Sequence, residues 1–470
     1  MKQHKAWLGL AVTTLLILGA WGLFASIPRT HAKTLLPASG FTGLNSAASG
    51  FHYQQTFNYS TSPYTVEQGK TDYVWGAQSA STTVPGVYNA FYLPFERDSG
   101  TNVTPVGQSL SWWQTNHPDW IEYKCDKTSP AYEYGDSNVP LDITNSAWLD
   151  YVMQNYVSWA FAHGYLGIAF DNLHTTNEFG RCGHFDISHN WVAQYTGNKV
   201  DTAYSNDVIA WAQNMASRIH TAKSGSTMAI NFRYNPSDST TSVALLGAAD
   251  ISADEGGWTN YGSGNITDSA WLTYTNNLTQ YVTLPGKGFL QFCQEPVVWT
   301  SVTNAMTQWC MANYFLVKND ISYLGITGSD GYGKFEWRNE YSAAQVGTAA
   351  SSMSLVPGTG AYTRSFTSGV VYVNPSSTTS YTVNLPAGTF QDLYGVTQGT
   401  SVVLAPVTGL VLVQTASPTP TPPPTSTPTP PPTSTPTPAP TSTPVPTFPC
   451  VVLQNGLMKV ATCSGSYTIP

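Results

Sequence analysis

Charged side chains are scarce in this 470-residue chain. Asp, Glu, Lys and Arg make up only 10% of it, against roughly 25% in an average soluble protein. Serine, threonine, asparagine, glycine and aromatic residues take their place, which suits a protein that works outside the cell among neutral polar ligands. The formal net charge of -8 argues against nucleic acid as a partner, because binding to nucleic acid needs clustered positive charge.

Two common arrangements of reactive residues are also missing. No C-x-x-C pair occurs among the six cysteines, which argues against a zinc site. No G-x-S-x-G sequence follows a predicted strand, which argues against a Ser-His-Asp hydrolase. His174, His184, Asp186 and His189 lie close together in the sequence, but their spacing matches no H-E-x-x-H or similar metal motif. A loop that braces Cys182 is the preferred interpretation, and a metal site is the alternative.

The longest apolar run lies at the N-terminus. Lys2 and Lys5 precede a largely apolar stretch of 22 residues, 6–27, which leads to a candidate cleavage point at Thr30-His31-Ala32. This layout predicts an export signal over residues 1–32. A stretch of this length could instead span a bilayer as an uncleaved membrane anchor. Either interpretation places the rest of the chain outside the membrane, secreted or at the cell surface.

Six cysteines in an exported chain are expected to form disulfides, although six allow 15 pairings. Their order along the chain narrows the choice. Cys125 and Cys182 follow consecutive predicted strands, and Cys293 and Cys310 flank one strand-to-helix unit. We expect these two pairs and, as a third pair, the isolated Cys450 and Cys463.

From Asp72 onward, short apolar runs alternate with longer helical patterns, which predicts a (β/α)8 barrel of the TIM type. Only about ten residues separate the first two candidate strands. A helix does not fit there, so the first unit is irregular or misassigned, and an open doubly wound sheet with fewer strands is the alternative. The candidate strands are 72–76, 87–95, 120–125, 166–171, 228–232, 250–254, 288–292 and 323–327, and the clearest helices are 147–163, 206–223, 269–281, 301–319 and 339–352.

The predicted barrel, residues 33–360, is followed by three further segments. Residues 361–416 change to a period of two with Gly and Pro between short runs, which predicts a small antiparallel β-sandwich domain. Residues 417–449 form a Pro/Thr-rich linker without a charged residue, and such a composition cannot bury a core. Residues 450–470 are a short tail. We expect the whole protein to be a monomer.

Two predicted strands end in carboxylates. Asp171 follows the apolar run 165–170, and Asp254 and Glu255 follow the run 249–253. The ends of barrel strands meet at one mouth, where two carboxyl groups about 5 to 9 Å apart could cleave a glycosidic bond. Alternation along a strand turns only one of Asp254 and Glu255 into that mouth.

Asp171 is the predicted nucleophile, or the base if the enzyme inverts configuration. Glu255 is the preferred proton donor, because Trp258 could desolvate it and raise its pKa, and Asp254 is its competitor. The alternative is that these residues have structural roles only. Asp171 would then cap a helix or accept a hydrogen bond within a loop, and Asp254 would cap a turn.

Other polar side chains near predicted strand ends would bind substrate at the same mouth. These candidates are Glu122, Tyr123, Asp142, Asn172, Asn231, Arg233, Gln291 and Asp330, with Gln294 beside Gln291 and the aromatic Trp258 beside the acids. The expected partner is a carbohydrate, and this chemistry requires no cofactor.

An ordered set of segments resembles the hypothetical glycosyl hydrolase family 15. The segments are Asp72-Tyr73-Val74-Trp75-Gly76, His117 to Tyr123, Pro140 to Asn145, Gly167 to Asn172 and Asp254-Glu255-Gly256. The resemblance covers roughly residues 68–415, and it implies a glycosidase-type barrel whose substrate is undefined. The placement of a nucleophile after strand four and an acid after strand six is also similar to α-galactosidase and dextranase-type barrels. That similarity implies retention of configuration, with Asp171 as nucleophile and Glu255 or Asp254 as acid/base.

We therefore expect a secreted glycoside hydrolase that acts on a neutral, α-linked polysaccharide or oligosaccharide. The alternatives are a non-catalytic carbohydrate-binding or cell-surface protein on a degenerate barrel, which the long linker would suit, and a metal-dependent glycan deacetylase. The distance between the carboxyl groups of Asp171 and Glu255 separates the mechanisms, since about 5 Å indicates retention and about 9 Å inversion.

Overall fold

The structure, a computed structural model, describes most of the chain beyond residue 50. The described residues are 51–52, 54–55, 70–77, 87–95, 98, 107–133, 138–235, 238–330, 337–415, 447–454 and 457–464. The predicted export signal or anchor and nearly all of the predicted linker lie outside these ranges. Among the helices that are described, none combines the length and the apolar character needed to cross a membrane.

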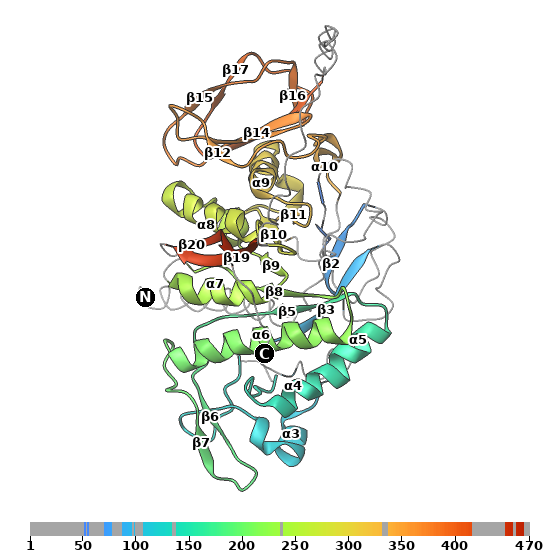
Figure 1. Ribbon diagram of the computed structural model, residues 1–470, viewed down its shortest axis with the longest axis vertical. Coiled ribbons are helices and arrows are strands. Elements are labelled where there is room, and N and C mark those ends of the chain that lie inside the picture. Colours follow the sequence, from blue (N-terminus) through green and yellow to red (C-terminus); the bar gives the residue numbers. More distant parts are fainter. Residues whose placement is uncertain are drawn as a thin grey trace, which may run out of the picture.

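Eight parallel strands form one continuous sheet that closes into a barrel (Figure 1). The sheet closes where the amide of Leu324 in the last strand donates to the carbonyl of His52, two residues before the first, at 3.2 Å. In order around the sheet the strands are β1 (Gln54–Gln55), β2 (Tyr73–Ala77), β3 (Tyr88–Pro94), β5 (Gly167–Asp171), β8 (Thr227–Asn231), β9 (Ile251–Asp254), β10 (Gly288–Gln294) and β11 (Tyr323–Thr327). The predicted barrel is confirmed, and the open sheet is wrong.

Two errors in the predicted strands cancel each other. Residues 120–125 were expected to form the third barrel strand, but they contain the end of a 3-10 helix, η4 (Pro118–Trp120), and a two-residue strand, β4 (Tyr123–Lys124). Strand β4 belongs to a separate three-stranded sheet with β6 (Arg181–Phe185) and β7 (Trp191–Ala193). The polar β1, in contrast, was not predicted. Strand β5 therefore remains fourth in the barrel and β9 remains sixth, as expected.

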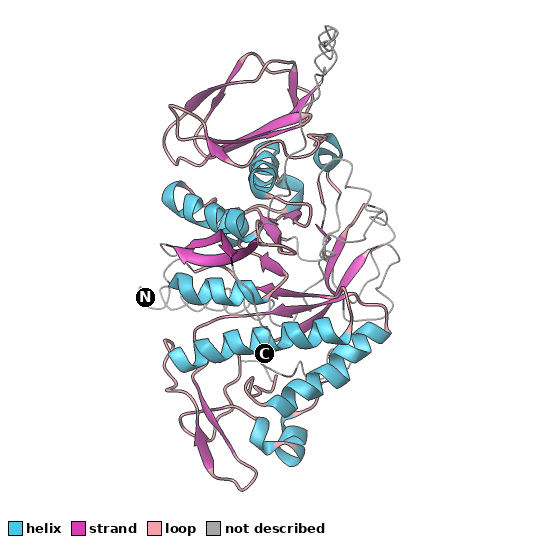
Figure 2. Cartoon of the chain, in the orientation of Figure 1, coloured by secondary structure: helices cyan, strands magenta, loops and turns pink. Residues whose placement is uncertain are grey.

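Helices surround the barrel strands (Figures 1 and 2). They are α3 (Leu110–Asn116), α4 (Ser146–Val152), the π-helix η5 (Met153–Val157), α5 (Ser158–Ala162), α6 (Thr202–Ala222), α7 (Ser239–Ala248), α8 (Asp268–Tyr281), α9 (Asn304–Val317) and α10 (Asn339–Ala343), with 3-10 turns η7 (Gly257–Gly262) and η8 (Trp299–Ser301). Asn145 caps α4 as predicted, since its side chain accepts from the amide of Ala147 at 2.9 Å. Helix α7 was not predicted, because its Ser/Thr-rich start reads as a loop, and α10 is shorter than expected.

The interior of the barrel is filled by side chains that alternate with outward ones along each strand. Ala169 of β5, Ala229 of β8 and Ala253 of β9 lie in this inner cluster together with Tyr73 and Tyr323. Strands with a period of two place every second residue on the same face. Positions 169, 229 and 253 thus mark the inward face of three neighbouring strands.

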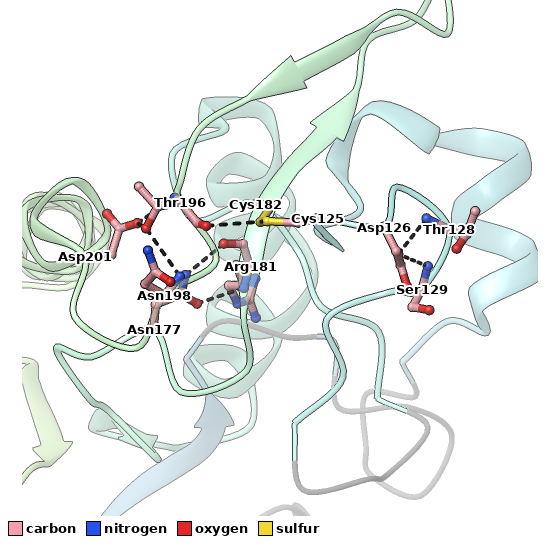
Figure 3. Close-up of a disulfide and its surroundings, with 10 residues drawn as sticks. All are labelled: Cys125, Asp126, Thr128, Ser129, Asn177, Arg181, Cys182, Thr196, Asn198 and Asp201. Carbon is pink, nitrogen blue, oxygen red and sulfur yellow. Dashed lines mark hydrogen bonds between the residues drawn. A yellow bond between two sulfur atoms is a disulfide. The ribbon is translucent and has the colours of Figure 1, made fainter.

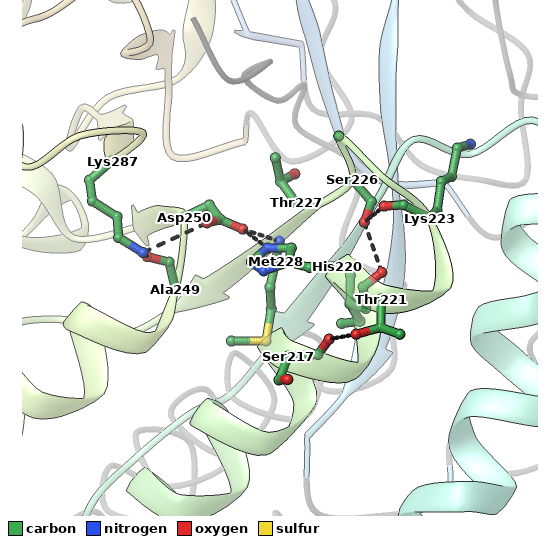
Figure 4. Close-up of polar contacts among 12 residues, drawn as sticks. Ser217, His220, Thr221, Lys223, Ser226, Thr227, Met228, Ala249, Asp250 and Lys287 are labelled. Carbon is green, nitrogen blue, oxygen red and sulfur yellow. Dashed lines mark hydrogen bonds and ion pairs between the residues drawn. The ribbon is translucent and has the colours of Figure 1, made fainter. Parts of the chain in front are cut away.

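Asp250 connects a helix to two strands at the N-terminal ends of the barrel strands (Figure 4). Its Oδ2 accepts from the backbone amide of Met228 and from Nε2 of His220, both at 2.8 Å. The pKa of His220 is raised, chiefly by this hydrogen bond to Asp250. Asp250 is therefore a structural residue that joins α6 to the start of β8 and β9.

A small β-sandwich follows the barrel, as predicted. Val370 of the larger sheet packs in one cluster with Val383 and Leu404 of the smaller sheet. The larger sheet contains β12 (Ser354–Leu355), β13 (Tyr362–Phe366), β14 (Gly369–Asn374), β18 (Thr408–Gln414) and β16 (Phe390–Asp392), and the smaller contains β15 (Tyr381–Asn384) and β17 (Ser401–Leu404). Strand β12 precedes the predicted boundary at residue 361.

The backbone forms an antiparallel hairpin near the C-terminus. It consists of β19 (Thr447–Gln454) and β20 (Leu457–Ser464), so it begins within the predicted linker. The pairing of Cys450 with Cys463 stays a prediction, because the side chains of this hairpin are outside the described structure.

Two of the three predicted disulfides are confirmed. Cys125 pairs with Cys182, with their Cα atoms 5.1 Å apart (Figure 3), and Cys293 pairs with Cys310, with their Cα atoms 6.0 Å apart. The first joins the segment after β4 to β6, and the second joins barrel strand β10 to its own helix α9.

Candidate active site

Three polar side chains meet at the C-terminal ends of β5, β8 and β9. Asp171, Asn231 and Glu255 each stand two positions beyond an alanine of the barrel interior. Because side chains two apart share a face of a strand, all three point into the mouth. This is the end of a β/α barrel where catalytic groups are carried.

The amide of Asn231 joins the two candidate catalytic carboxyl groups. Its Nδ2 donates to Oδ1 of Asp171 and to Oε1 of Glu255, each at 2.8 Å. Two bonds of 2.8 Å to one nitrogen keep these oxygens at most about 5.6 Å apart. Two carboxyl groups brought this close are compatible with the separation of about 5 to 5.5 Å found in retaining glycosidases.

Asp171 is held on both oxygens. Besides the bond from Asn231, its Oδ2 accepts from the hydroxyl of Tyr92 in β3 at 3.0 Å, and the residue is fully buried. Donors to both oxygens restrict the rotation of the carboxyl group. Glu255, in contrast, is partly exposed. One carboxyl group is thus fixed and enclosed, and the other reaches solvent.

Asp254 points away from the mouth, into the layer of helices. Its Oδ1 accepts from the amides of Gly256 at 2.7 Å and Gly257 at 3.1 Å, and its Oδ2 accepts from the hydroxyl of Tyr274 in α8 at 2.7 Å. Asp254 therefore caps the turn after β9 and anchors it to α8. Of the two adjacent acids, only Glu255 is placed for chemistry in the mouth.

The chain bends sharply at Asn172, directly after Asp171. Asn172 has a φ of 62°, in the left-handed region that non-glycine residues avoid. Asn tolerates this region better than most residues do. The side-chain nitrogen of Asn172 is buried and has no hydrogen-bond partner among the described residues. Asn172 thus remains a candidate for contact with substrate.

Two predicted substrate-binding residues face the helices instead of the mouth. Trp258 is fully buried, and its Nε1 donates to Thr275 in α8 at 3.2 Å. Gln291 is also fully buried and donates to the hydroxyl of Tyr274 at 2.6 Å. The prediction for both is not supported by their position, because apolar and amide side chains at this depth serve the packing of α8. Gln294 lies on the inward face with Leu290.

Arg233 and Asp330 stabilise loops that follow barrel strands. Asp330 accepts from the backbone amide of Trp299 at 2.6 Å. Arg233 donates to Oδ1 of Asn260 at 3.2 Å, and its Nε lies 4.0 Å from Oδ2 of Asp254. Both residues follow strands that end at the mouth, and these contacts hold the loops that they belong to.

Glu122, Tyr123 and Asp142 belong to the segment between β3 and β5, where they meet the three-stranded sheet. Glu122 and Asp142 are buried, and ligand atoms of these two and of His184 all lie within 4.8 Å of one another. Asp142 also accepts from Gln194 at 3.0 Å. These residues support the inserted segment beside the Cys125–Cys182 disulfide.

Asp186 and His174 of the predicted histidine cluster make contacts of their own. Asp186 caps the turn between β6 and β7 by accepting from the amides of Ser188 and Asn190 at 2.9 and 2.7 Å. His174 stacks on Tyr204 of α6. Cys182 itself lies within strand β6, and the interpretation of this cluster as a brace for Cys182 stays a prediction.

Tyr92 was not predicted as a member of the site. It lies on the same face of β3 as Tyr88 and Ala90, which are in the barrel interior. The period of two in residues 87–95 could have found it, because the last inward residue of a barrel strand reaches the mouth.

No protein-family model matches the chain, and no curated protein matches its sequence. The resemblance to the hypothetical glycosyl hydrolase family 15 therefore stays a prediction. Solved structures that are similar include an α-amylase from Anoxybacillus, at 11% identity over 71% of this chain and 77% of that chain with a TM-score of 0.39. A noncanonic maltogenic α-amylase from Thermotoga neapolitana matches at 10% identity over 70% and 78%, with a TM-score of 0.42. At such values the function has to be inferred from the site itself.

Proposed function

We propose that this chain is a glycoside hydrolase that retains the configuration of the anomeric carbon. Asp171 is its nucleophile and Glu255 its acid/base. The observation that carries the proposal is the amide of Asn231, which donates at 2.8 Å to both carboxyl groups at the mouth of the barrel. It supports a short separation of the two carboxyl groups, which suits direct attack by one of them on the sugar, whereas an inverting enzyme needs room for a water molecule between its base and the sugar.

The first step forms a covalent intermediate. The Asp171 carboxylate attacks the anomeric carbon while the Glu255 carboxyl group donates its proton to the leaving oxygen, so the glycosidic bond breaks and a glycosyl ester forms. Tyr92 and Asn231 hold the attacking carboxylate in one orientation. Such fixed geometry lowers the entropic part of the barrier.

The second step returns the enzyme to its starting state. The Glu255 carboxylate takes a proton from water, the resulting hydroxide attacks the anomeric carbon, and the ester bond to Asp171 breaks. Glu255 is the partly exposed member of the pair, and a residue that takes a proton from water has to be accessible to water. Two inversions leave the sugar with its original configuration.

The expected substrate is a neutral, α-linked polysaccharide or oligosaccharide, handled outside the cell. The low content of charged residues and the export-type layout of residues 1–32 support this, and the two disulfides suit an oxidising compartment. Mass spectrometry of the protein recovered from its producing cells tests the location. A soluble extracellular chain that begins near residue 33 indicates cleavage, and an intact membrane-bound chain indicates the anchor.

A reducing-sugar screen of the purified protein on α-linked glycans tests the activity. Asp171→Ala and Glu255→Gln are each expected to lower kcat/KM by about a thousandfold or more, because the two groups act as a unit. Glu178→Gln is the matched control, since Glu178 pairs with Lys199 on the surface. Full activity in both site variants would show that the roles are wrong.

Trapping of the intermediate tests the retaining mechanism. A 2-deoxy-2-fluoro glycoside of the hydrolysed sugar is expected to accumulate as an ester, because the fluorine slows both steps and affects the second enough to observe it. Peptide mass spectrometry should then find the label on the peptide that contains Asp171. Hydrolysis that leaves the protein unlabelled and yields the inverted anomer would exclude this mechanism.

A further inference from the structure

The turn after Glu255 carries an exposed aromatic ring on an unfavourable backbone. Asn260 and Tyr261 in η7 adopt φ values of 46° and 57°, both in the left-handed region that costs free energy for residues with a side chain. The side chain of Tyr261 is 49% exposed. No other aromatic side chain in the described part of the chain is as exposed. Burial therefore does not explain why this conformation is kept.

Arg233, which follows β8, holds this turn in place. It donates from Nη1 to Oδ1 of Asn260 at 3.2 Å and from Nη2 to the carbonyl of Gly257 at 3.5 Å. Its guanidinium also lies over the ring of Tyr261, with 5.6 Å between Cζ and the ring centroid. The orientation of the Tyr261 ring is thus set by a planar cation on one side, while much of its surface remains open to solvent.

Gly256 is required for this arrangement. A Cβ atom at position 256 would lie 2.0 Å from Nη1 of Arg233 and 2.8 Å from the Tyr261 ring. The backbone amide of Tyr261 donates to the carbonyl of Gly256 at 3.2 Å. Since Gly256 directly follows Glu255, the ring of Tyr261 packs against the backbone next to the residue proposed to protonate the leaving oxygen.

We propose that Tyr261 forms the binding subsite for the leaving-group sugar, by stacking on its ring, and that Arg233 is the positioning residue for Tyr261. This inference rests on the proposed glycosidase function. A proton donor lies on the leaving-group side of the scissile bond, so the aromatic surface next to Glu255 meets the sugar that departs. Aromatic rings bind the apolar faces of sugars through burial of surface, which also suits a chain with little charge.

Glycosyl fluorides test this assignment, because fluoride departs without a sugar in that subsite. The probes are the glucosyl, galactosyl and mannosyl fluorides of both anomeric configurations, and the disaccharides formed by the same sugars. Tyr261→Ala is expected to lower kcat/KM about tenfold on the disaccharide that is hydrolysed and to leave kcat/KM on the matching fluoride unchanged. Transfer to a sugar acceptor should fall by the same factor, since the acceptor occupies the same subsite.

Two variants separate a binding role from a structural one. Tyr261→Phe keeps the ring and is expected to act like the wild-type protein on both probes. Arg233→Gln removes the planar charge and is expected to repeat the selective loss on disaccharides, with Arg233→Lys recovering part of it. Equal losses on fluorides and disaccharides, or no loss in Tyr261→Ala, would overturn this inference alone. A wild-type protein inactive on every probe would overturn the proposed function with it.

Discussion

At the scale of single residues, the site depends on one amide. Asn231 donates from the same nitrogen to Asp171 and Glu255, so it holds two carboxyl groups close together that would repel each other when both are ionised. The Tyr92 hydroxyl holds the other oxygen of Asp171. This arrangement allows one acid to be ionised and its neighbour to carry the proton, as glycoside hydrolysis requires.

Substitution of Asn231 tests this balance. Asn231→Ala removes a hydrogen bond to an ionised group worth about 1.5 to 3 kcal/mol, so kcat/KM is expected to fall by roughly ten- to a hundredfold. Asn231→Asp should be more harmful, because a third carboxylate is added. The pH profile of kcat/KM provides the measurement, and the ascending limb in Asn231→Asp should be displaced. Wild-type kinetics in both variants would show that the bridge has no catalytic importance.

At the scale of elements, the pairing of β10 with α9 encloses an acid. Glu295 follows β10 beside the Cys293–Cys310 disulfide and is 2% exposed. Burial raises the pKa of Glu295 from 4.5 to about 7, although the charge of Arg338 opposes that shift. Its Oε1 lies 3.3 Å from Sγ of Cys310. Outward residues of β10 thus form a packed layer against α9, distinct from the inward residues of the mouth.

The raised pKa of Glu295 predicts how stability depends on pH. A carboxyl group whose pKa is higher in the folded state than in the unfolded state stabilises the fold while it is protonated. For Glu295 this contribution is complete below the unfolded-state pKa of 4.5, and it is lost as the pH rises through the folded-state pKa of about 7. Glu295→Gln should abolish the dependence. Urea unfolding from pH 5 to 9 is expected to show that the free energy of unfolding of the variant increases relative to that of the wild type as the pH rises, by up to about 3 kcal/mol.

Two comparisons make that experiment decisive. Glu178→Gln, on the surface, should leave the pH dependence of the wild type in place. A constant free-energy difference between Glu295→Gln and the wild type across this range would contradict the assignment of a proton to Glu295.

At the scale of the whole molecule, the barrel and the β-sandwich share one core. Val371, Val373 and Val411 of the larger sheet lie in the same cluster as Trp309 and Phe315 of α9. Arg364 of β13 crosses this boundary, since its Nη1 donates to the carbonyls of Phe315 at 3.1 Å and Lys318 at 2.7 Å. A cation on the last carbonyls of a helix also favours its dipole.

Arg364→Met is expected to weaken the coupling of the two domains. Loss of these charge-assisted bonds should cost about 2 kcal/mol, because the carbonyls of α9 are left without their donor. Calorimetry should show one unfolding transition in the wild type and a lower, broader one in the variant. Arg218→Met, which removes an ion pair with Asp150 and a hydrogen bond to Asn214 away from this boundary, is the control. An unchanged transition in Arg364→Met would mean that the sandwich adds nothing to the barrel.

Local sequence patterns predicted most barrel strands correctly. The predictions were wrong where contacts between residues distant in the sequence determine whether a segment joins the sheet. The apolar residues Trp120 and Ile121 resemble a strand, but they pack in the segment inserted between β3 and β5. The pair Gln54–Gln55 has no strand-like pattern, and it is in the sheet because it lies beside β2. The two errors compensated, so the positions of Asp171 and Glu255 around the barrel were predicted correctly.

The sequence by itself determined which strands end in acids, two of the disulfide pairs, and that a β-sandwich follows the barrel. These follow from local periodicity and chain order. Only the tertiary structure decided that Glu255 and not Asp254 enters the mouth, that Asn231 joins it to Asp171, and that Trp258 is core. The physical reason is that each of these depends on which face of a strand meets a neighbour brought from far along the chain.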